Sequence, residues 1–168
     1  MNHITLITGG IKSGKSKYAL ELAASRGHHF DPAILFSGNS AQKQKKRMNE
    51  SVHLATAISQ AQFHAQLVLI DSLTTWMDNL LYFYAGQPKA VEREIRGLIG
   101  VAGERRTSMI FVTNEISFDV SPTQPFRQKF SEELGQLNQA IAKMADEVVL
   151  MISGIPQTIQ KQPTIAQF

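Results

Sequence analysis

The stretch "ITLITGGIKSGKSKYALELA", residues 4–23, decides the fold of this 168-residue chain. A short apolar run leads into a glycine-rich turn, and the turn leads into a segment with helical spacing. In phosphate-binding loops of this kind, backbone N–H groups cradle phosphates, a lysine reaches the β- and γ-oxygens, and a hydroxyl reaches Mg²⁺. The residues that fit the pattern G-x-x-x-x-G-K-[ST] without deviation are Gly9, Gly14, Lys15 and Ser16.

The predicted nucleotide site needs an acidic partner, and Asp71 at the end of "LVLID" is the natural one. A carboxylate at the tip of a neighbouring parallel strand can hold the hydration shell of Mg²⁺ beside the loop. Aspartate is also favoured as the N-cap of a following helix, and both roles can coexist. We predict Lys15 and Asp71 as catalytic residues, Ser16 and Asp71 as Mg²⁺ ligands, and Mg²⁺ with ATP or GTP as the cofactor. The predicted nucleotide-binding residues are Gly9, Gly10, Ile11, Lys12, Ser13, Gly14, Lys15, Ser16, Ser37 and Gly38.

Apolar runs of strand length alternate with helical patterns along the whole chain. The expected strands are 4–8, 33–36, 52–56, 67–70, 109–112, 148–152 and, more weakly patterned, 157–161. The expected helices are 16–25, 73–84, 88–103 and 126–144. Continuous apolar strands between helices indicate a three-layer α/β fold, with a mostly parallel sheet and helices on both faces. We expect one domain over residues 1–161 and a peripheral tail at 162–168.

Composition narrows the class of protein. Seventeen basic and 14 acidic side chains give a net charge of +3, which is too mild to indicate nucleic acid. The absence of cysteine excludes disulfides, thiolate metal sites and a cysteine nucleophile. No apolar stretch approaches the roughly 18 residues that a membrane span needs. The chain does not start with a basic region and an apolar signal core, so we expect a cytoplasmic protein.

Two classes of phosphate-loop protein fit the sequence poorly. A GTPase needs a guanine-reading motif [NT]-K-x-D, and the nearest candidate, "TNEI" at 113–116, has Asn in place of Lys and no Asp. A small nucleoside kinase carries an arginine-rich lid. Arg105 and Arg106 precede an expected strand, and we expect them to be solvated.

Four blocks of sequence resemble one known family. They are "TGGIKSGKSKYAL" (8–20), "LVLIDSLTTWMDNLL" (67–81), "FVTNEISFDVSP" (111–122) and "LGQLNQAIAKMADEVVLMISGIP" (134–156). Their order and spacing are similar to those of the bifunctional adenosylcobinamide kinase/adenosylcobinamide-phosphate guanylyltransferase family of cobalamin biosynthesis. The likeness covers most of the chain outside residues 37–66 and the tail.

The resemblance implies a RecA-like fold, a trimer and two reactions. The family phosphorylates the aminopropanol hydroxyl of adenosylcobinamide with a nucleoside triphosphate. It then takes GMP from GTP onto a histidine and passes it to the new phosphate. The resemblance implies that the loop binds the nucleotide and that Asp71 replaces a family Glu. The substrate-proximal motif positions that it implies are Thr74, Thr75, Asn114 and Glu115.

The stretch "SGNSAQKQKKRMNESVHLATAISQ", residues 37–60, departs from the family pattern. When Arg47 and Met48 are aligned, Ser51 stands where the family has its guanylylated histidine. A serine without a neighbouring base cannot replace imidazole as the nucleophile. His53 could take that role if the loop reshapes, although a surface or half-buried side chain in an extended segment is the alternative. We therefore expect the kinase step, and we predict that no GMP–histidine intermediate forms.

Some alternatives stay open at the level of sequence. The basic run at 43–47 can be a solvated helical face or a contact for triphosphate or the corrinoid's phosphate. Nucleic acid is the least favoured partner, because no aromatic residues interleave with the charges. The chain can also be a non-catalytic nucleotide-binding paralogue, or a kinase for another hydroxylated substrate. The expected partners are thus a corrinoid, a nucleoside triphosphate and further copies of this chain.

Overall fold

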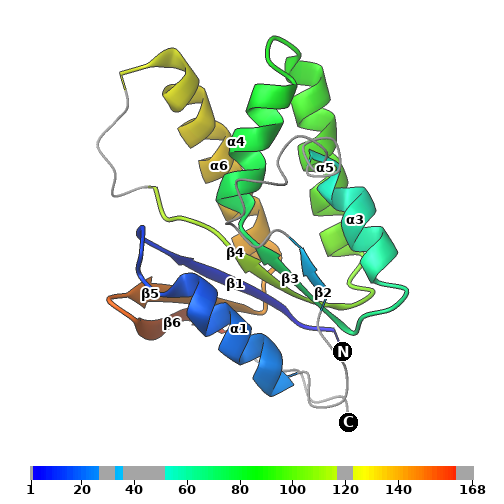
Figure 1. Cartoon of the computed structure of the whole chain (residues 1–168), viewed down its shortest axis with the longest axis vertical. Coiled ribbons are helices and arrows are strands. Elements are labelled where there is room, and N and C mark those ends of the chain that lie inside the picture. The colour runs from blue at the N-terminus through cyan, green and yellow to red at the C-terminus, as the bar shows by residue number, and fades with distance from the viewer. Residues whose placement is uncertain (1, 27–32, 36–51, 117–122, 162–168) are drawn as a thin grey trace, which may run out of the picture.

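The computed structural model describes residues 2–26, 33–35, 52–116 and 123–161 (Figure 1). Its strands form one six-stranded sheet in the order β2-β3-β4-β1-β5-β6. Strands β1 to β5 pair in parallel, and β6 runs antiparallel to β5. The C-terminal ends of β1, β3 and β4 therefore meet at one edge of the sheet. The strands are β1 (Ile4–Gly9), β2 (Ala33–Leu35), β3 (Leu67–Asp71), β4 (Ser108–Val112), β5 (Glu147–Ile152) and β6 (Ile155–Lys161).

Helices cover both faces of the sheet (Figure 1). Helix α1 packs on one face over a smaller apolar core, and the other four described helices enclose a larger core on the opposite face. The alternation of side chains along β1 serves both cores, since Ile4 and Leu6 face the larger one and Ile7 faces the smaller one. The helices are α1 (Lys15–Arg26), α3 (Leu54–Ala61), α4 (Leu73–Phe83), α5 (Pro88–Gly103) and α6 (Pro125–Met144).

The predicted three-layer α/β fold is confirmed, but the strand expected at 52–56 is wrong. The chain there enters helix α3, whose buried side chains Leu54 and Ile58 are one helical turn apart. Over five residues, the alternating Val52, Leu54 and Thr56 are compatible with a strand. Only the longer window shows the spacing of four that places Leu54 and Ile58 on one helical face.

Strand β6 begins two residues earlier than expected and closes the sheet as an edge strand. All of its residues are exposed, and Ile155 shows 67% of its surface to solvent. Exposure on both sides explains why the sequence there lacks the apolar pattern of a buried strand. Among the helices within the described ranges, none is long and apolar enough to cross a membrane.

Candidate nucleotide-binding site

The loop between β1 and α1 takes its shape from two glycines. Gly9 has φ of 149°, and a Cβ there would lie 2.5 Å from the carbonyl oxygen of Met151. Gly14 has φ of 94°, and a Cβ there would lie 3.3 Å from the Cα of Gly154. The Gly154 N–H also donates to the Ser13 carbonyl at 2.9 Å. The phosphate loop is thus held against the β5–β6 turn, where only glycine fits.

Lys15 is the first residue of α1, and its side chain folds back into the loop. Its ammonium Nζ donates to the carbonyl oxygens of Gly9 at 3.0 Å and Gly10 at 2.6 Å. Only 8% of Lys15 is exposed. Burial lowers the pKa of the Lys15 ammonium, and the nearby Asp71 carboxylate partly offsets that lowering. The cation that a triphosphate needs is thus hydrogen-bonded to the loop carbonyls.

A cavity of about 380 Å³ lies over the loop and contains most of the predicted site. Asp71 enters it from the tip of β3, beside Lys15 and Ser16, as the sequence predicts. The helix N-cap is the next residue, because the Ser72 Oγ accepts from the Thr75 N–H at 3.2 Å. Asp71 is therefore not used as the cap of α4. The lining residues are Ile11, Lys12, Ser13, Gly14, Lys15, Ser16, Lys17, Asp71, Ser72, Val112 and Asn114.

The predicted loop residues Gly9 and Gly10 form the wall behind Lys15 rather than the lining of the cavity. The buried Ser13 Oγ has no hydrogen-bond partner among the residues that the structure describes. Ser37 and Gly38, also predicted to bind nucleotide, lie outside the described residues, as does Ser51. The loop, Asp71 and Asn114 are thus the part of the predicted site that the structure brings together.

A hydrogen-bonded network fixes Asn114 beside the cavity over the phosphate loop. We call this cavity the phosphate cavity. The Asn114 N–H donates to the Thr74 hydroxyl at 2.8 Å, so the start of α4 holds the end of β4. The Thr113 hydroxyl donates to Oδ1 of Asn138 at 2.8 Å. Asn138 in turn donates from Nδ2 to the Asn114 carbonyl at 3.1 Å. Thr74 and Asn138 therefore act on Asn114 from two different helices.

Sequence reasoning assigned no role to Asn138, although it lies inside one of the four blocks. A signal was present, because Asn138 stands four residues after Leu134 and three before Ile141, on the apolar stripe of α6. A polar side chain on the inward face of a helix needs a partner. The pattern alone does not show that the partners are Thr113 and Asn114, since they come from a distant strand.

The other two substrate-proximal motif residues, Thr75 and Glu115, do not line the phosphate cavity. Thr75 is exposed and its hydroxyl pairs with that of Ser72 at 3.1 Å. The Glu115 N–H donates to the Gly9 carbonyl at 3.1 Å, which continues the pairing of β4 with β1. Glu115 lines a second cavity.

His53 directly precedes α3 and is its N-cap residue, so the extended segment expected around it is wrong. Its Nδ1 lies 3.2 Å from the Glu94 carboxylate on α5, and its side chain is 46% exposed. His53 is not among the described residues that line either of the two cavities. The expectation for Arg105 is also wrong, because it is paired with Asp146 instead of solvated.

A family model described as "Cobinamide kinase / cobinamide phosphate guanyltransferase" matches residues 39–159. The chain belongs to this family. It is 29% identical over 171 residues to the bifunctional adenosylcobalamin biosynthesis protein CobP of Pseudomonas aeruginosa, an alignment that covers 94% of this chain and 98% of CobP. It is 28% identical over 178 residues to the bifunctional protein CobU of Salmonella typhimurium, covering 89% of this chain and 96% of that protein.

Solved structures agree on the fold. The crystal structure of a KaiC-like protein from Pyrococcus horikoshii superposes with a TM-score of 0.51 over 88% of this chain and 70% of that one. The sequences are 14% identical, so the likeness concerns the architecture alone. It supports the RecA-like arrangement of sheet and helices that the family resemblance implies.

Proposed function

We propose that this member of the CobU family is an adenosylcobinamide kinase. It transfers the γ-phosphoryl group of ATP or GTP to the side-chain hydroxyl of the corrinoid. The observation that carries the proposal is the complete phosphate cradle: loop, Lys15 and Asp71 share one cavity. Phosphoryl transfer depends on positioning and charge neutralisation more than on covalent chemistry by the protein, and this site offers both.

Each residue of the cradle has a part in that reaction. The backbone N–H groups of the loop hold the phosphates, and the Lys15 ammonium moves from the loop carbonyls to the phosphate oxygens. Asn114 lines the same cavity on the side of β4 and can donate to the nucleotide or its acceptor. The γ-phosphorus leaves the β–γ bridging oxygen and bonds to the acceptor oxygen, whose proton is released.

Magnesium fits the donors that the site offers. Ser16 and Asp71 line the same cavity and supply a hydroxyl and a carboxylate, the oxygen ligands that Mg²⁺ prefers. Within the described ranges, no group of three His, Asp or Glu side chains could hold a metal ion, which suits an ion held partly by the nucleotide's phosphates. When bound, Mg²⁺ neutralises the charge that develops on the phosphates.

We further propose that the guanylyltransferase step of the family is lost in this chain. The sequence places Ser51 at the position of the nucleophilic histidine. The position of His53 supports the same view, because this histidine stands at the N-terminus of α3 and lines neither of the two described cavities. The corrinoid and the triphosphate remain the proposed substrates.

A trimer and a cytoplasmic location complete the proposal. The trimer rests on the family resemblance, and the exposed isoleucines Ile152 and Ile155 at the β5–β6 turn suit a contact between subunits. The cytoplasm is where ATP and GTP are available to a biosynthetic kinase.

The test is product analysis with a variant that removes only one charge. Wild-type protein with cobinamide, Mg²⁺ and ATP or GTP should yield a corrinoid heavier by one phosphate group. Asp71→Asn should fold normally and lower the rate about a hundredfold, or about 2.7 kcal/mol of barrier. The matched control is Asp78→Asn on the exposed face of α4, which should keep the wild-type rate. If the wild type forms no cobinamide phosphate where a known family member does, a non-catalytic role or another hydroxylated substrate replaces this proposal.

A further inference from the structure

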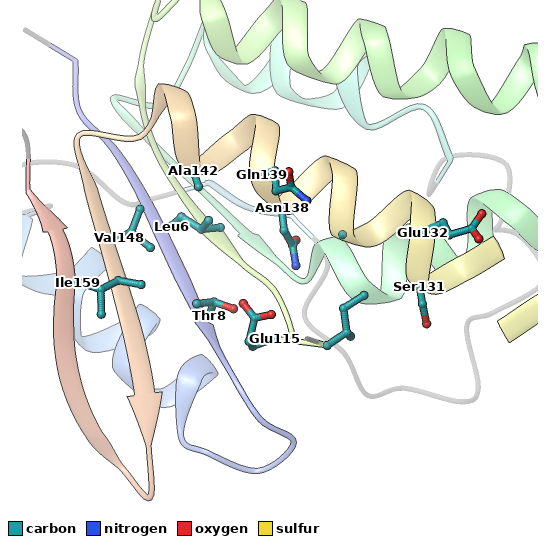
Figure 2. Close-up of a pocket in the computed structure, with 12 residues that line it drawn as sticks. Leu6, Thr8, Glu115, Ser131, Glu132, Asn138, Gln139, Ala142, Val148 and Ile159 are labelled. Atoms are coloured by element: carbon teal, nitrogen blue, oxygen red, sulfur yellow. The ribbon is translucent and has the colours of Figure 1, made fainter. Parts of the chain in front are cut away.

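A second cavity of about 520 Å³ opens between helix α6 and the β1–β5–β6 side of the sheet (Figure 2). We call it the α6 groove. Its apolar walls come from Leu6 on β1, Ala142 on α6, Val148 on β5 and Ile159 on β6. Its polar lining includes Thr8, Glu115, Glu132 and Gln139. The volume is within the range of small-molecule sites.

The Thr8 hydroxyl is the polar group of the α6 groove whose surroundings point to a ligand. Thr8 is only 4% exposed, and its Oγ1 has no hydrogen-bond partner within the described part of the chain. In Figure 2 this hydroxyl points into the groove, toward the side of Glu115. A buried hydroxyl without a partner costs free energy. That cost is recovered when a ligand in the groove supplies the missing hydrogen bond.

The α6 groove adjoins the phosphate cavity through two consecutive residues. Asn114 lines the phosphate cavity and Glu115 lines the groove, and the Cα atoms of neighbouring residues are about 3.8 Å apart. Both residues are held in place, Asn114 by Thr74 and Asn138, and Glu115 by its backbone bond to Gly9. A ligand in the groove can therefore present a group to the phosphate side across this short segment.

We infer that the α6 groove binds one edge of the acceptor corrinoid and directs its hydroxyl arm toward the phosphate cavity. This inference rests on the proposed kinase function. A corrinoid rim carries methyl groups and carboxamides, which match the apolar walls and the Thr8 hydroxyl. The ring is too large for the groove, so the rest of it stays outside. The structure thereby assigns the nucleotide and the acceptor to opposite sides of the Asn114–Glu115 segment.

Gly135 offers a direct way to fill the groove. It lies on α6 in the groove wall, and a Cβ there would come no closer than 3.9 Å to Ile116 Cδ1. Gly135→Leu should therefore fit the helix and occupy the space of the ligand. The matched control is Gly100→Leu on α5, where a Cβ meets nothing within 4 Å. Both changes replace a helical glycine, but only one fills the groove.

The measurement is equilibrium dialysis of cobinamide, which is coloured, alongside calorimetry of Mg²⁺–ATP. Gly135→Leu should weaken cobinamide binding at least tenfold and leave ATP binding within twofold, and Gly100→Leu should change neither. Wild-type cobinamide affinity in Gly135→Leu would overturn the assignment of the groove while leaving the kinase function standing. If the wild type neither binds nor phosphorylates cobinamide, both the groove assignment and the kinase proposal fall.

A second variant decides the matter if Gly135→Leu does not fold. Thr8→Val removes only the unpartnered hydroxyl, so the melting temperature should stay level or rise while cobinamide binding weakens threefold or more. The control is Thr107→Val, because the buried Thr107 hydroxyl donates to the Ala65 carbonyl at 2.9 Å. That variant should melt earlier and keep its cobinamide affinity. Unchanged cobinamide binding in Thr8→Val would contradict the inference.

Discussion

At the scale of one residue, Lys15 shows how the phosphate loop holds a buried cation. Its ammonium is buried, its pKa is lowered by that burial, and two loop carbonyls satisfy it. A triphosphate replaces those carbonyls with charged oxygens, which bind a cation more strongly. Binding should therefore raise the pKa of Lys15 again, and affinity should fall as the pH rises through the lowered pKa of the free protein.

Removing the Lys15 ammonium tests whether the loop binds the triphosphate. Lys15→Ala should weaken Mg²⁺–ATP or Mg²⁺–GTP binding more than tenfold, or at least about 1.4 kcal/mol, measured by calorimetry. Lys89→Ala on the exposed face of α5 removes the same charge far from the loop and should bind normally. Unchanged affinity in Lys15→Ala would show that the nucleotide binds elsewhere.

Asn138 is the second residue whose role can be measured alone. Asn138→Leu keeps a side chain of similar length but leaves the Thr113 hydroxyl and the Asn114 carbonyl without their amide partner. Buried groups left without a partner cost about 1–3 kcal/mol, so the free energy of unfolding should fall by that amount in a denaturant titration. Gln136→Leu, on the exposed side of the same helix, should change it by less than about 0.5 kcal/mol. A small effect in both would mean that the network does not hold Asn114.

Among the elements, those with long periodic patterns were predictable from sequence. Helix α6 follows its stripe from Phe130 to Ile141, and α5 begins at Pro88 as expected. The failures are short or exposed elements. Five residues around Val52 do not distinguish a strand from the start of α3, and β6 has no buried face to produce a pattern.

The candidate site also has a part that the sequence predicts and a part that it does not. The phosphate loop is local in sequence, so its residues and geometry follow from one motif. Asp71 and Asn114 could be placed because parallel strands end at a common edge. The α6 groove could not be predicted, because it depends on how α6 sits over β1 and β5, which no local spacing records. Thr8 lies inside an apolar strand, and nothing in the sequence indicates that its hydroxyl has no hydrogen-bond partner among the described residues.

An ion pair between Arg105 and Asp146 joins three elements near the N-terminal ends of β1 and β5. Asp146, just before β5, accepts from the Ile4 N–H at 2.8 Å and from Arg105 Nη1 at 2.8 Å. Burial alone would raise the pKa of the Asp146 carboxyl, but these two bonds lower it below its ordinary value. Arg105 also donates to the Met144 carbonyl. The pair therefore ties the ends of α5 and α6 to the start of β1.

This pair predicts an acid-dependent stability. The unfolded chain takes up the Asp146 proton at a higher pH than the folded chain, so the contribution is present near neutral pH and is lost as the pH falls below about 4. Asp146→Asn should lower the free energy of unfolding by about 1–3 kcal/mol at neutral pH. The difference from wild type should shrink toward about pH 3. Asp78→Asn is the control, and a difference for Asp146→Asn that does not vary with pH would contradict the assignment.

At the scale of the whole molecule, the fate of the α-phosphate tests whether this chain carries out the guanylyltransferase step. After incubation with GTP labelled at the α-phosphate and denaturation, we expect no label on the protein. The sequence has Ser51 at the position of the family's histidine, and a serine hydroxyl is almost wholly protonated at neutral pH. His53 lines neither of the two described cavities. Acid-labile label that disappears in His53→Ala would show instead that His53 is the nucleophile and that the chain carries out both reactions.

Assembly is the other property of the whole molecule. Light scattering should give the mass of three chains, as the family resemblance implies. Ile155→Lys at the β5–β6 turn should shift that mass toward one chain, and Gln157→Lys on the same strand should not. A wild-type protein that stays monomeric at micromolar concentration would remove the trimer from the proposal.

The transfer of the γ-phosphate tests the kinase function most directly. Wild-type protein is mixed with Mg²⁺, cobinamide and ATP labelled at the γ-phosphate, and the corrinoid is separated and counted. We predict that the label moves to the corrinoid at one phosphate per molecule, and that Lys15→Ala and Asp71→Asn slow the transfer. Label that remains on ATP or appears only as free phosphate, under conditions where a known family member labels cobinamide, would contradict the function proposed for this protein.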